Sequence, residues 1–386
     1  MYNFDIEINR KNTNSLKWDF NKERGKDENL LPFWVADMDF KLPDSIIDSL
    51  INKAKEGVFG YSDPKIDYYN ALIDWYKTEY DVNLDLKNII VSPSVVFSIC
   101  TLIKIVTKEN DAIIINEPVY YPFKSSITVN NRRPISSDLI IRNDKYVIDF
   151  NDFEEKIKNN NVKAYILCSP HNPVGRVWDY DELERIVDIC NKYNVFIISD
   201  EIHSDFVYNK KFVSIAKLNP NNYAIVSGPT KTFNMPGLKI SHVIVNDKKL
   251  KDDFLTEFDR IGYSQQSIFG LVGALSAYKY GKNWLNEVRD YIYNNILFIE
   301  EYLNKYLPKI KFIKPEGTYL IWLDFKEYKL KDKELDDLIT NKAKLWLDLG
   351  IIFGKSGSGY ERINVATNRN LIKKMLDSLY SVFKDL

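Results

Sequence analysis

The chain has 386 residues, of which 45% are hydrophobic and 28% are charged, enough apolar material for roughly two or three domains around a large buried core. Its formal net charge of -1 provides no overall attraction to nucleic acid or to an acidic membrane surface, so neither is expected as a partner. No run of about 18 apolar residues could span a bilayer, and the first residues lack the basic and apolar blocks of a secretory signal. The expected location is therefore the cytoplasm.

In chain order, short β-branched apolar runs alternate with longer helical patterns through the middle of the chain. Strands are expected at 88–92, 112–116, 164–168, 195–199, 224–227 and 242–245. Helices are expected between them, at about 95–106 and 179–193. Continuous apolar strands separated by helices are typical of a mostly parallel sheet that is covered on both faces, which predicts an α/β fold.

Beyond residue 267 the pattern changes. An amphipathic stretch runs to about 307, followed by an expected strand, helix and strand at 319–325, 332–349 and 362–365. We therefore expect an N-terminal segment, a large central domain and a small C-terminal domain that packs with the N-terminal segment, at residues 1–45, 46–280 and 281–386. The cysteines lie far apart in apolar stretches and are expected to be buried hydrophobic residues, with no disulfide or metal site: Cys100, Cys168 and Cys190.

A lysine follows the expected strand at 224–227, in a turn of small residues, Gly and Pro. Lys231 is oddly placed there for a surface side chain, and a desolvated lysine has a lowered pKa that frees its amine to react with an aldehyde. Ser227 and Thr230 offer hydroxyls, and Lys239 offers a positive charge, all suited to a phosphate group. Taken alone, such a turn more often holds a solvated loop lysine.

Two adjacent carboxylates, Asp200 and Glu201, follow the expected strand at 195–199. Ligands bind at the carboxyl edge of an open α/β sheet, and a buried acid there needs a cationic partner such as a protonated pyridine ring. The alternative is that these acids cap a helix. Asn172 stands in an Asn-Pro turn after the strand at 164–168, held extended with its amide free to donate, and an ordinary turn is the alternative.

Two further segments offer binding groups. Val95 and Val96 begin a helix directly after the strand at 88–92, where free backbone N–H groups suit a phosphate, although the glycines of a nucleotide-binding loop are absent. Arg362 and Asn364 stand at the start of the last expected strand, and a fixed guanidinium can grip a carboxylate with two hydrogen bonds. A surface strand is the alternative for this segment.

The order of these segments is an Asn-Pro-x-Gly turn, an Asp-Glu strand end, a Ser-x-x-x-Lys turn and an Arg-x-Asn strand. Together they resemble the fold-type-I family of pyridoxal-5′-phosphate (PLP) enzymes, the aminotransferase superfamily, over nearly the whole chain. The resemblance implies a large domain with a mostly parallel seven-stranded sheet and a smaller α+β domain. It also implies PLP as cofactor and an amino acid as substrate.

The resemblance implies that five residues surround the cofactor ring. Lys231 would bond to the cofactor and act as base, Asp200 would pair with the pyridine nitrogen, and Asn172 would contact the 3-oxygen. His203 stands where many aminotransferases have the tyrosine that bonds this oxygen. Tyr120 fits the aromatic side chain that stacks on the ring, and it counts with Lys231 and Asp200 as catalytic.

The resemblance also implies the phosphate and substrate contacts. The expected phosphate ligands are Val95, Val96, Ser227, Thr230 and Lys239. Tyr61 fits the tyrosine that reaches the phosphate of the neighbouring subunit, which implies a homodimer. Arg362 would bind the α-carboxylate of the substrate, with Asn172 and Ala36 as further substrate contacts.

The stretches at 32–40 and 200–203 resemble a narrower branch, the bacterial C–S lyases of the cystalysin-like cystathionine β-lyase and maltose-regulon-modulator type. That branch implies α,β-elimination on an S-substituted cysteine to give pyruvate, ammonia and a thiol. Transamination is the alternative, and a regulatory protein that keeps the fold is a distant one. The chain departs from the pattern with Lys239 for Arg, Leu349 for Pro, and Gly228 for Ser, which leaves Ser227 or Thr230 to supply the hydroxyl.

Overall fold

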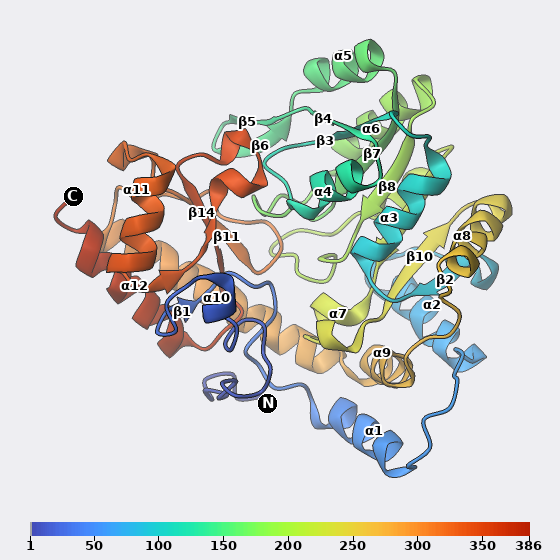
Figure 1. Ribbon diagram of the computed structural model, residues 1–386, viewed down its shortest axis with the longest axis horizontal. Coiled ribbons are helices and arrows are strands. Elements are labelled where there is room, and N and C mark those ends of the chain that lie inside the picture. The colour runs from blue at the N-terminus through green and yellow to red at the C-terminus, as the bar shows by residue number, and fades with distance from the viewer. Residues whose placement is uncertain (1) are drawn as a thin grey trace.

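The computed structural model describes residues 2–386 as a large unit beside a smaller one (Figure 1). The large unit holds a seven-stranded sheet in the order β2-β10-β9-β8-β7-β3-β4. In chain order its strands are β2 (Ile89–Ser92), β3 (Ala112–Ile115), β4 (Arg133–Ser136), β7 (Val162–Cys168), β8 (Phe196–Asp200), β9 (Tyr223–Ser227) and β10 (Ser241–Val245). Only β10 runs in the opposite direction to the other strands of this sheet, so the predicted mostly parallel sheet is confirmed.

Helices cover both faces of this sheet, which explains why its strands are apolar along their length. In β3, Ile113 and Ile115 pack in the cluster beneath one layer of helices, whereas Ile114 packs in the cluster on the opposite face. The first layer consists of α3 (Val95–Val106), α4 (Pro122–Val129) and α8 (Lys248–Arg260). The opposite layer includes α2 (Ile66–Tyr80), α5 (Phe150–Asn160) and α6 (Tyr180–Lys192). The remaining helices of the large unit are α1 (Asp44–Lys55), α7 (Pro229–Thr232) and α9 (Ile268–Tyr280).

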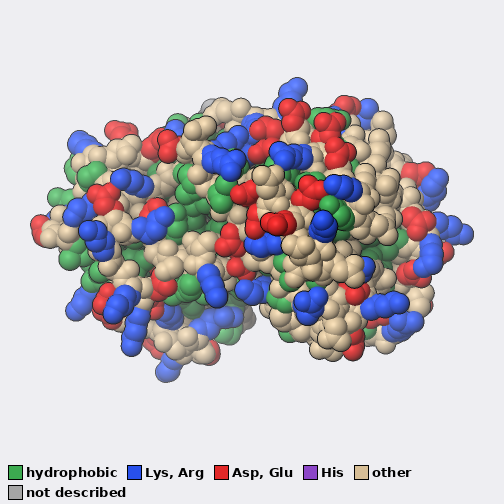
Figure 2. Space-filling view, turned by 90° about the horizontal axis from the view of Figure 1, so that it is seen from above, with side chains coloured by type: hydrophobic (Ala, Val, Ile, Leu, Met, Phe, Trp, Pro, Cys, Tyr) green, Lys and Arg blue, Asp and Glu red, His purple; other side chains and the backbone are tan. Residues whose placement is uncertain are grey.

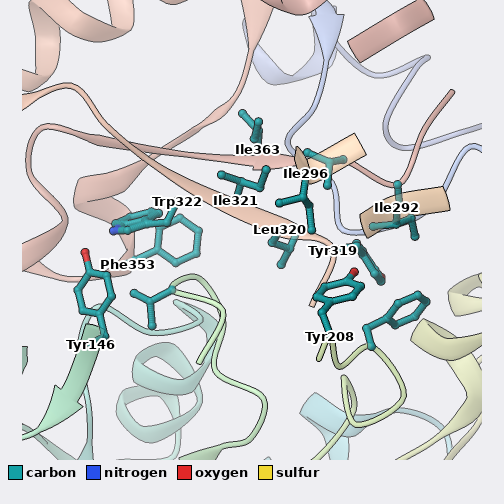
Figure 3. Close-up of a cluster of buried hydrophobic side chains, with 14 of the residues drawn as sticks. Tyr146, Tyr208, Ile292, Ile296, Tyr319, Leu320, Ile321, Trp322, Phe353 and Ile363 are labelled. Atoms are coloured by element: carbon teal, nitrogen blue, oxygen red, sulfur yellow. The ribbon is translucent and has the colours of Figure 1, made fainter. Parts of the chain in front are cut away.

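The smaller unit is built on a three-stranded antiparallel sheet in the order β11-β14-β13. Its elements are α10 (Lys282–Tyr306), β11 (Leu320–Asp324), α11 (Asp332–Asp337), β13 (Asp348–Leu349), β14 (Tyr360–Asn364) and α12 (Arg369–Phe383). Figure 3 shows β11 between Ile292 and Ile296 of α10 on one side and Tyr146 and Tyr208 of the large unit on the other. The two units therefore share one continuous hydrophobic core.

The N-terminal segment lies against the smaller unit. Strand β1 (Leu31–Pro32) pairs in parallel with β12 (Leu345–Trp346). The rings of Trp34 and Trp346 stack with their centroids 4.3 Å apart. The proposed division of the chain at residues 45 and 280 stays a prediction.

Three sequence-based expectations need correction. The expected helix at 332–349 ends early, because α11 passes into a π-helical turn at Leu338–Lys342 and the chain then forms β12 and β13. Its unbroken apolar run Leu345–Leu347 looks the same in a helix and in a buried strand. The edge strand β4 was not expected because it is polar and contains a proline, nor was the hairpin of β5 (Leu139–Arg142) and β6 (Lys145–Ile148). Cys168 and Cys190 are buried as expected, whereas Cys100 is only half-buried.

The surface carries both signs of charge. Figure 2 shows Lys and Arg side chains interspersed with Asp and Glu across the face in view, as the net charge of -1 indicates. Within residues 2–386, no helix has both the length and the apolar content that crossing a membrane requires.

The core predicts a stability effect at Trp284 of α10. This side chain is 0% exposed, donates from Nε1 to the Lys41 carbonyl at 3.0 Å and lies edge-on to Phe4. Trp284→Ala should lower the free energy of unfolding by about 3–5 kcal/mol, because it removes a large buried ring and leaves the Lys41 carbonyl without this donor. Urea unfolding measures this. Tyr280→Ala, at a side chain that is 60% exposed, should change the free energy by less than about 1 kcal/mol, and equal losses would contradict the assignment.

Candidate active site

A cavity of about 290 Å³ opens at the carboxyl edge of the large sheet, facing the smaller unit. This volume is at the lower end of the ~300–1,000 Å³ that is usual for small-molecule sites. All the residues that the family resemblance assigns to the site, except Ser227 and Tyr61, line it: Ala36, Val95, Val96, Tyr120, Asn172, Asp200, His203, Thr230, Lys231, Lys239 and Arg362.

Strand ends explain most of this convergence. In the parallel ladder Asp200 is paired with Cys168 of β7 on one side and with Val226 of β9 on the other. The turn with Asn172 follows β7, and the turn with Lys231 follows β9. Parallel strands end at one edge of a sheet, so residues far apart in the sequence meet there.

Lys231 is half-buried in α7, and its Nζ donates a hydrogen bond to the Ala36 carbonyl at 2.5 Å. Burial lowers its pKa to about 8, with Asp37 opposing this effect and Arg362 adding to it. Near pH 8 about half of the amines are therefore neutral, and a neutral amine is a nucleophile and a base. The desolvated lysine predicted from the sequence is what the structure contains.

Asp200 ends β8 and is 4% exposed, with its carboxylate accepting from the Ile202 N–H at 3.1 Å. Burial raises its pKa to about 7, against the lowering effect of the Ile202 N–H and of Lys231. A cation beside it would restore the charged form, so the site suits a protonated ring nitrogen. The helix-capping alternative is wrong, because a turn and no helix follows β8.

Glu201 points away from the cavity, although burial raises its pKa to about 7 as well. Its Oε1 accepts from the Ser199 hydroxyl at 3.1 Å and from the Ile215 N–H at 3.0 Å. Ser227 also lies off the cavity wall, since its hydroxyl donates to the Glu201 carbonyl at 3.2 Å. Of the two hydroxyls proposed for a phosphate, the structure therefore brings only that of Thr230 to the cavity.

Packing explains why position 228 is a glycine and not a serine. A Cβ atom built there would lie 2.9 Å from the Ser241 Cα and 3.2 Å from the Ile240 carbonyl oxygen, closer than side chains approach a backbone. The close approach of these two segments excludes a serine at this position unless the backbone shifts. The missing hydroxyl is thus a consequence of packing between the β9–α7 turn and the start of β10.

Arg362 of β14 is 3% exposed and is held from three sides. Its Nη2 donates to the Trp34 carbonyl at 2.7 Å and forms an ion pair with Asp348, and its Nη1 donates to Asn172 Oδ1 at 3.2 Å. Burial raises the pKa of Asp348, and the Arg362 guanidinium opposes this effect. The guanidinium therefore enters the cavity in a fixed orientation that suits a carboxylate.

At the opposite wall, α3 begins at Val95 with its first N–H groups free of helical partners. Ser94 caps this helix, accepting from the Phe97 N–H at 3.3 Å. Lys239 is exposed at the rim. A helix N-terminus with a nearby lysine favours an anion such as a phosphate.

Several cavity residues were not predicted from the sequence. Asp348 lay inside the expected helix at 332–349, yet it pairs with Arg362 across neighbouring strands. Cys168 and Trp34 also line the cavity. The apolar surroundings of Cys168 and Trp34 in the sequence do not indicate a functional role. For Asp348 the one hint was an acid directly after the apolar run Leu345–Leu347.

Tyr61 lies elsewhere, in the loop between α1 and α2, and is 96% exposed. It borders a separate shallow cavity formed with residues 262–269. Its role towards a neighbouring subunit stays a prediction.

The class I and II aminotransferase family model matches residues 28–379. The chain belongs to this family. It is 35% identical over 367 residues to cystathionine beta-lyase PatB of Bacillus subtilis (strain 168), covering 94% of this chain and 95% of that one. Cystalysin from Treponema denticola, solved with PLP, is 33% identical with a TM-score of 0.95 over 100% of this chain and 99% of that one.

A PLP-bound structure from Clostridium difficile 630, named as an aminotransferase, is 42% identical with a TM-score of 0.96, covering 99% of this chain and all of that chain. These similarities confirm the resemblance and the fold predicted from the sequence, including the narrower lyase branch. This member of the family is an enzyme.

Burial of the lysine predicts a pH-dependent stability difference. The pKa of Lys231 is about 8 when folded and 10.5 ordinarily, so the unfolded chain binds more protons between these values and stability rises with pH there. Without ligand, the wild-type chain should be about 2 kcal/mol less stable than Lys231→Met near pH 7, which is less than the full pKa shift implies because the half-buried amine keeps part of its hydration. This gap should narrow above pH 8 and close only above pH 10.5. Urea unfolding across this range measures it.

Lys41→Met is the matched control, because the Lys41 side chain is 65% exposed. Its stability relative to the wild type should not vary with pH between 7 and 10. A constant gap for Lys231→Met over the same range would contradict a desolvated amine.

Proposed function

We propose that this enzyme is a PLP-dependent carbon–sulfur β-lyase that converts an S-substituted cysteine such as cystathionine into pyruvate, ammonia and a thiol. The main support is the meeting of a desolvated amine, a buried acid and a fixed guanidinium in one cavity: Lys231, Asp200 and Arg362. The names of two similar proteins, cystathionine beta-lyase PatB and cystalysin, favour this reaction, whereas the similar Clostridium difficile 630 protein is named an aminotransferase, the alternative reaction.

The cavity fits PLP in its polar groups. Three buried nitrogen atoms of its lining side chains have no hydrogen-bond partner within residues 2–386: Trp34 Nε1, His203 Nδ1 and Arg362 Nε. Such atoms are costly unless a ligand pairs with them. Burial, Lys231 and Arg362 all lower the pKa of His203, so its imidazole is neutral and can donate one N–H.

Each end of the cofactor has a partner on this chain. Lys231 Nζ would hold the aldehyde carbon, Asp200 the ring nitrogen, and Asn172 and His203 the ring oxygen. The start of α3, Thr230 and Lys239 would hold the phosphate. Tyr120, whose pKa burial raises above its usual range, would present a neutral ring to the cofactor.

Bound PLP supplies an electron sink for the pair left when the Cα–H bond of the substrate breaks. Arg362 binds the α-carboxylate and so orients this bond, while Lys231 Nζ accepts the α-proton as general base. A base with a pKa of about 8 is well matched to work near neutral pH. Asp200, whose charged form a bound ring cation would favour, would keep the proton on the ring nitrogen.

A product assay tests the reaction. Wild-type enzyme with PLP and cystathionine should release pyruvate and free thiol in equal amounts, without any added keto acid. Lys231→Ala should lose at least about 10³-fold in kcat, because no group remains to accept the α-proton. Pyruvate is measured with a coupled dehydrogenase and the thiol with a chromogenic disulfide.

Asn209→Ala is a suitable control, since its amide contacts the Tyr293 hydroxyl at the surface, and it should keep wild-type rates. No pyruvate, together with conversion of the cofactor to its amine form by an amino donor and its return to the aldehyde form by a keto acid, would show a transaminase instead.

We also propose that the enzyme acts as a homodimer in the cytoplasm, with no nucleic-acid or membrane partner. Large apolar side chains are exposed together around the loop between α1 and α2: Val58, Phe59, Tyr61 and Ile66. A second copy of the chain would bury them, and an apolar surface of this kind is typical of an interface.

Tyr61→Phe tests the shared site. If its hydroxyl reaches the phosphate held by the neighbouring subunit, this change should weaken PLP binding roughly tenfold while the dimer persists. Absorbance titration gives the affinity, and light scattering gives the mass. A wild-type mass of one chain, or unchanged PLP affinity in Tyr61→Phe, would count against this arrangement.

A further inference from the structure

The segment of residues 33–39 crosses the cavity as a strap whose backbone carbonyls are held one after another. The Asn364 amide donates from Nδ2 to the carbonyls of Val35 and Asp37, at 2.6 and 2.5 Å. The orientation of this amide is set because its Oδ1 accepts from the Ala366 N–H at 2.9 Å. One side chain therefore fixes the two carbonyls on either side of Ala36.

The carbonyl between them serves a different partner. Ala36 O accepts from Lys231 Nζ at 2.5 Å and from the Tyr319 hydroxyl at 3.0 Å. These donors lie 195 and 283 residues away in the chain. Tyr319 is fully buried, with its ring edge-on to Phe206 and to His203.

The rest of the strap is anchored as firmly. Arg362 donates to the Trp34 carbonyl at 2.7 Å, and Asn234 donates to the Met38 carbonyl at 2.9 Å. Arg10 grips the carboxylate of Asp37 through both Nη atoms, at 3.0 and 2.7 Å. Because every neighbouring group is held, the Ala36 oxygen has little freedom to leave the lysine.

We propose that Asn364 positions the Ala36 carbonyl oxygen for Lys231, and that the Tyr319 hydroxyl shares this oxygen and so limits how strongly it binds the amine. The oxygen holds the amine whenever the lysine is not bonded to a ligand. The inference rests on the proposed function, in which the amine of Lys231 is released and then moves a proton. A neutral acceptor keeps the freed amine in the cavity without adding a charge. It also stabilises the ammonium form more than the amine, which tunes the pKa.

The charged and titratable groups that act on Lys231 come from every neighbouring element. Asp37 of the strap and Asp200 of β8 favour the ammonium form, whereas Arg362 of β14 and Lys239 disfavour it. His203 also faces this cluster, and it is neutral because its pKa lies well below the usual range. Hydrogen bonding to the Ala36 oxygen affects the pKa of Lys231 in addition to these charges, and substitutions can change it without altering any of them.

Two substitutions should move the pKa of Lys231 in opposite directions. Tyr319→Phe removes a donor that competes for the same oxygen, so the bond from the ammonium strengthens and the pKa should rise by about 0.5. Asn364→Ala frees the strap, so the carbonyl can turn away from Lys231 and the pKa should fall by about 0.5–1. A general loss of packing would move both variants in the same direction.

The readout is the rate at which the full-length chain, freed of cofactor, captures added PLP between pH 6 and 10. Only the neutral amine attacks the aldehyde, so the midpoint of the rate profile reports the pKa of Lys231. The titration of PLP itself is common to all variants and cancels in the comparison. In the loaded enzyme, Tyr319→Phe should shift the pH profile of kcat in the same direction and leave KM within about twofold.

Tyr208→Phe is the matched control. Tyr208 lies in the same buried cluster as Tyr319 (Figure 3), and its hydroxyl has no hydrogen-bond partner within residues 2–386. Its removal should leave the midpoint where the wild-type chain has it. Circular dichroism tests whether each variant folds. If Asn364→Ala does not fold, the midpoint of Tyr319→Phe alone tests the proposal.

A midpoint for Tyr319→Phe equal to that of Tyr208→Phe would overturn the proposal that Tyr319 and Lys231 share the Ala36 oxygen, as would shifts of Tyr319→Phe and Asn364→Ala in the same direction. Failure of the wild-type chain to capture PLP at all would overturn the proposed function instead. The two failures are therefore distinguishable.

Discussion

Removal of water from one small cavity is the constraint on which the rest of this site depends. Burial lowers the pKa of the Lys231 amine to about 8 and raises that of the Asp200 carboxyl to about 7. The pKa values of a basic and an acidic side chain therefore lie close together. In exposed side chains the two pKa values would keep their ordinary separation of several pH units. The meeting of these two pKa values near neutral pH is therefore a product of desolvation, and the mutual attraction of the two groups opposes it.

Charged groups stay in such a place only when the fold holds them there. The sheet edge positions Asp200 through the backbone of β8, and α7 positions Lys231 just after β9. Arg362 comes from the smaller unit, where Asp348 and the Trp34 carbonyl hold its guanidinium. Since both units supply charges to one cavity, the shared hydrophobic core between them is as much a part of the site as the polar groups.

Strand ends made part of the site predictable. Lys231, Asp200 and Asn172 each follow an apolar run by a few residues, and parallel strands must bring such positions together. The direction in which a side chain points was harder to predict from the sequence. Because β9 is buried on both faces, its sequence has no polar alternation, and nothing in it shows that Ser227 points towards Glu201 and away from the cavity.

Asp348 and Tyr319 escaped prediction for a related reason. Asp348 follows an apolar run that a helix and a strand explain equally well, and its partner Arg362 is known only from the pairing of β13 with β14. Tyr319 acts through a backbone oxygen, and a carbonyl leaves no trace in the residue type of Ala36. Interactions made by the backbone are the ones that sequence patterns describe least well.

The strap also has a consequence for the order of events during synthesis. Its residues leave the ribosome early, yet Asn364, which holds the Val35 carbonyl, lies 329 positions later. The large sheet can form once β10 has emerged, but the Val35 and Asp37 carbonyls lack their Asn364 partner until β14 is made. Contacts of such long separation form late in folding. Nascent chains that already contain Lys231 and Asp200 thus lack a closed pocket, which delays the appearance of a reactive amine until the protein is complete.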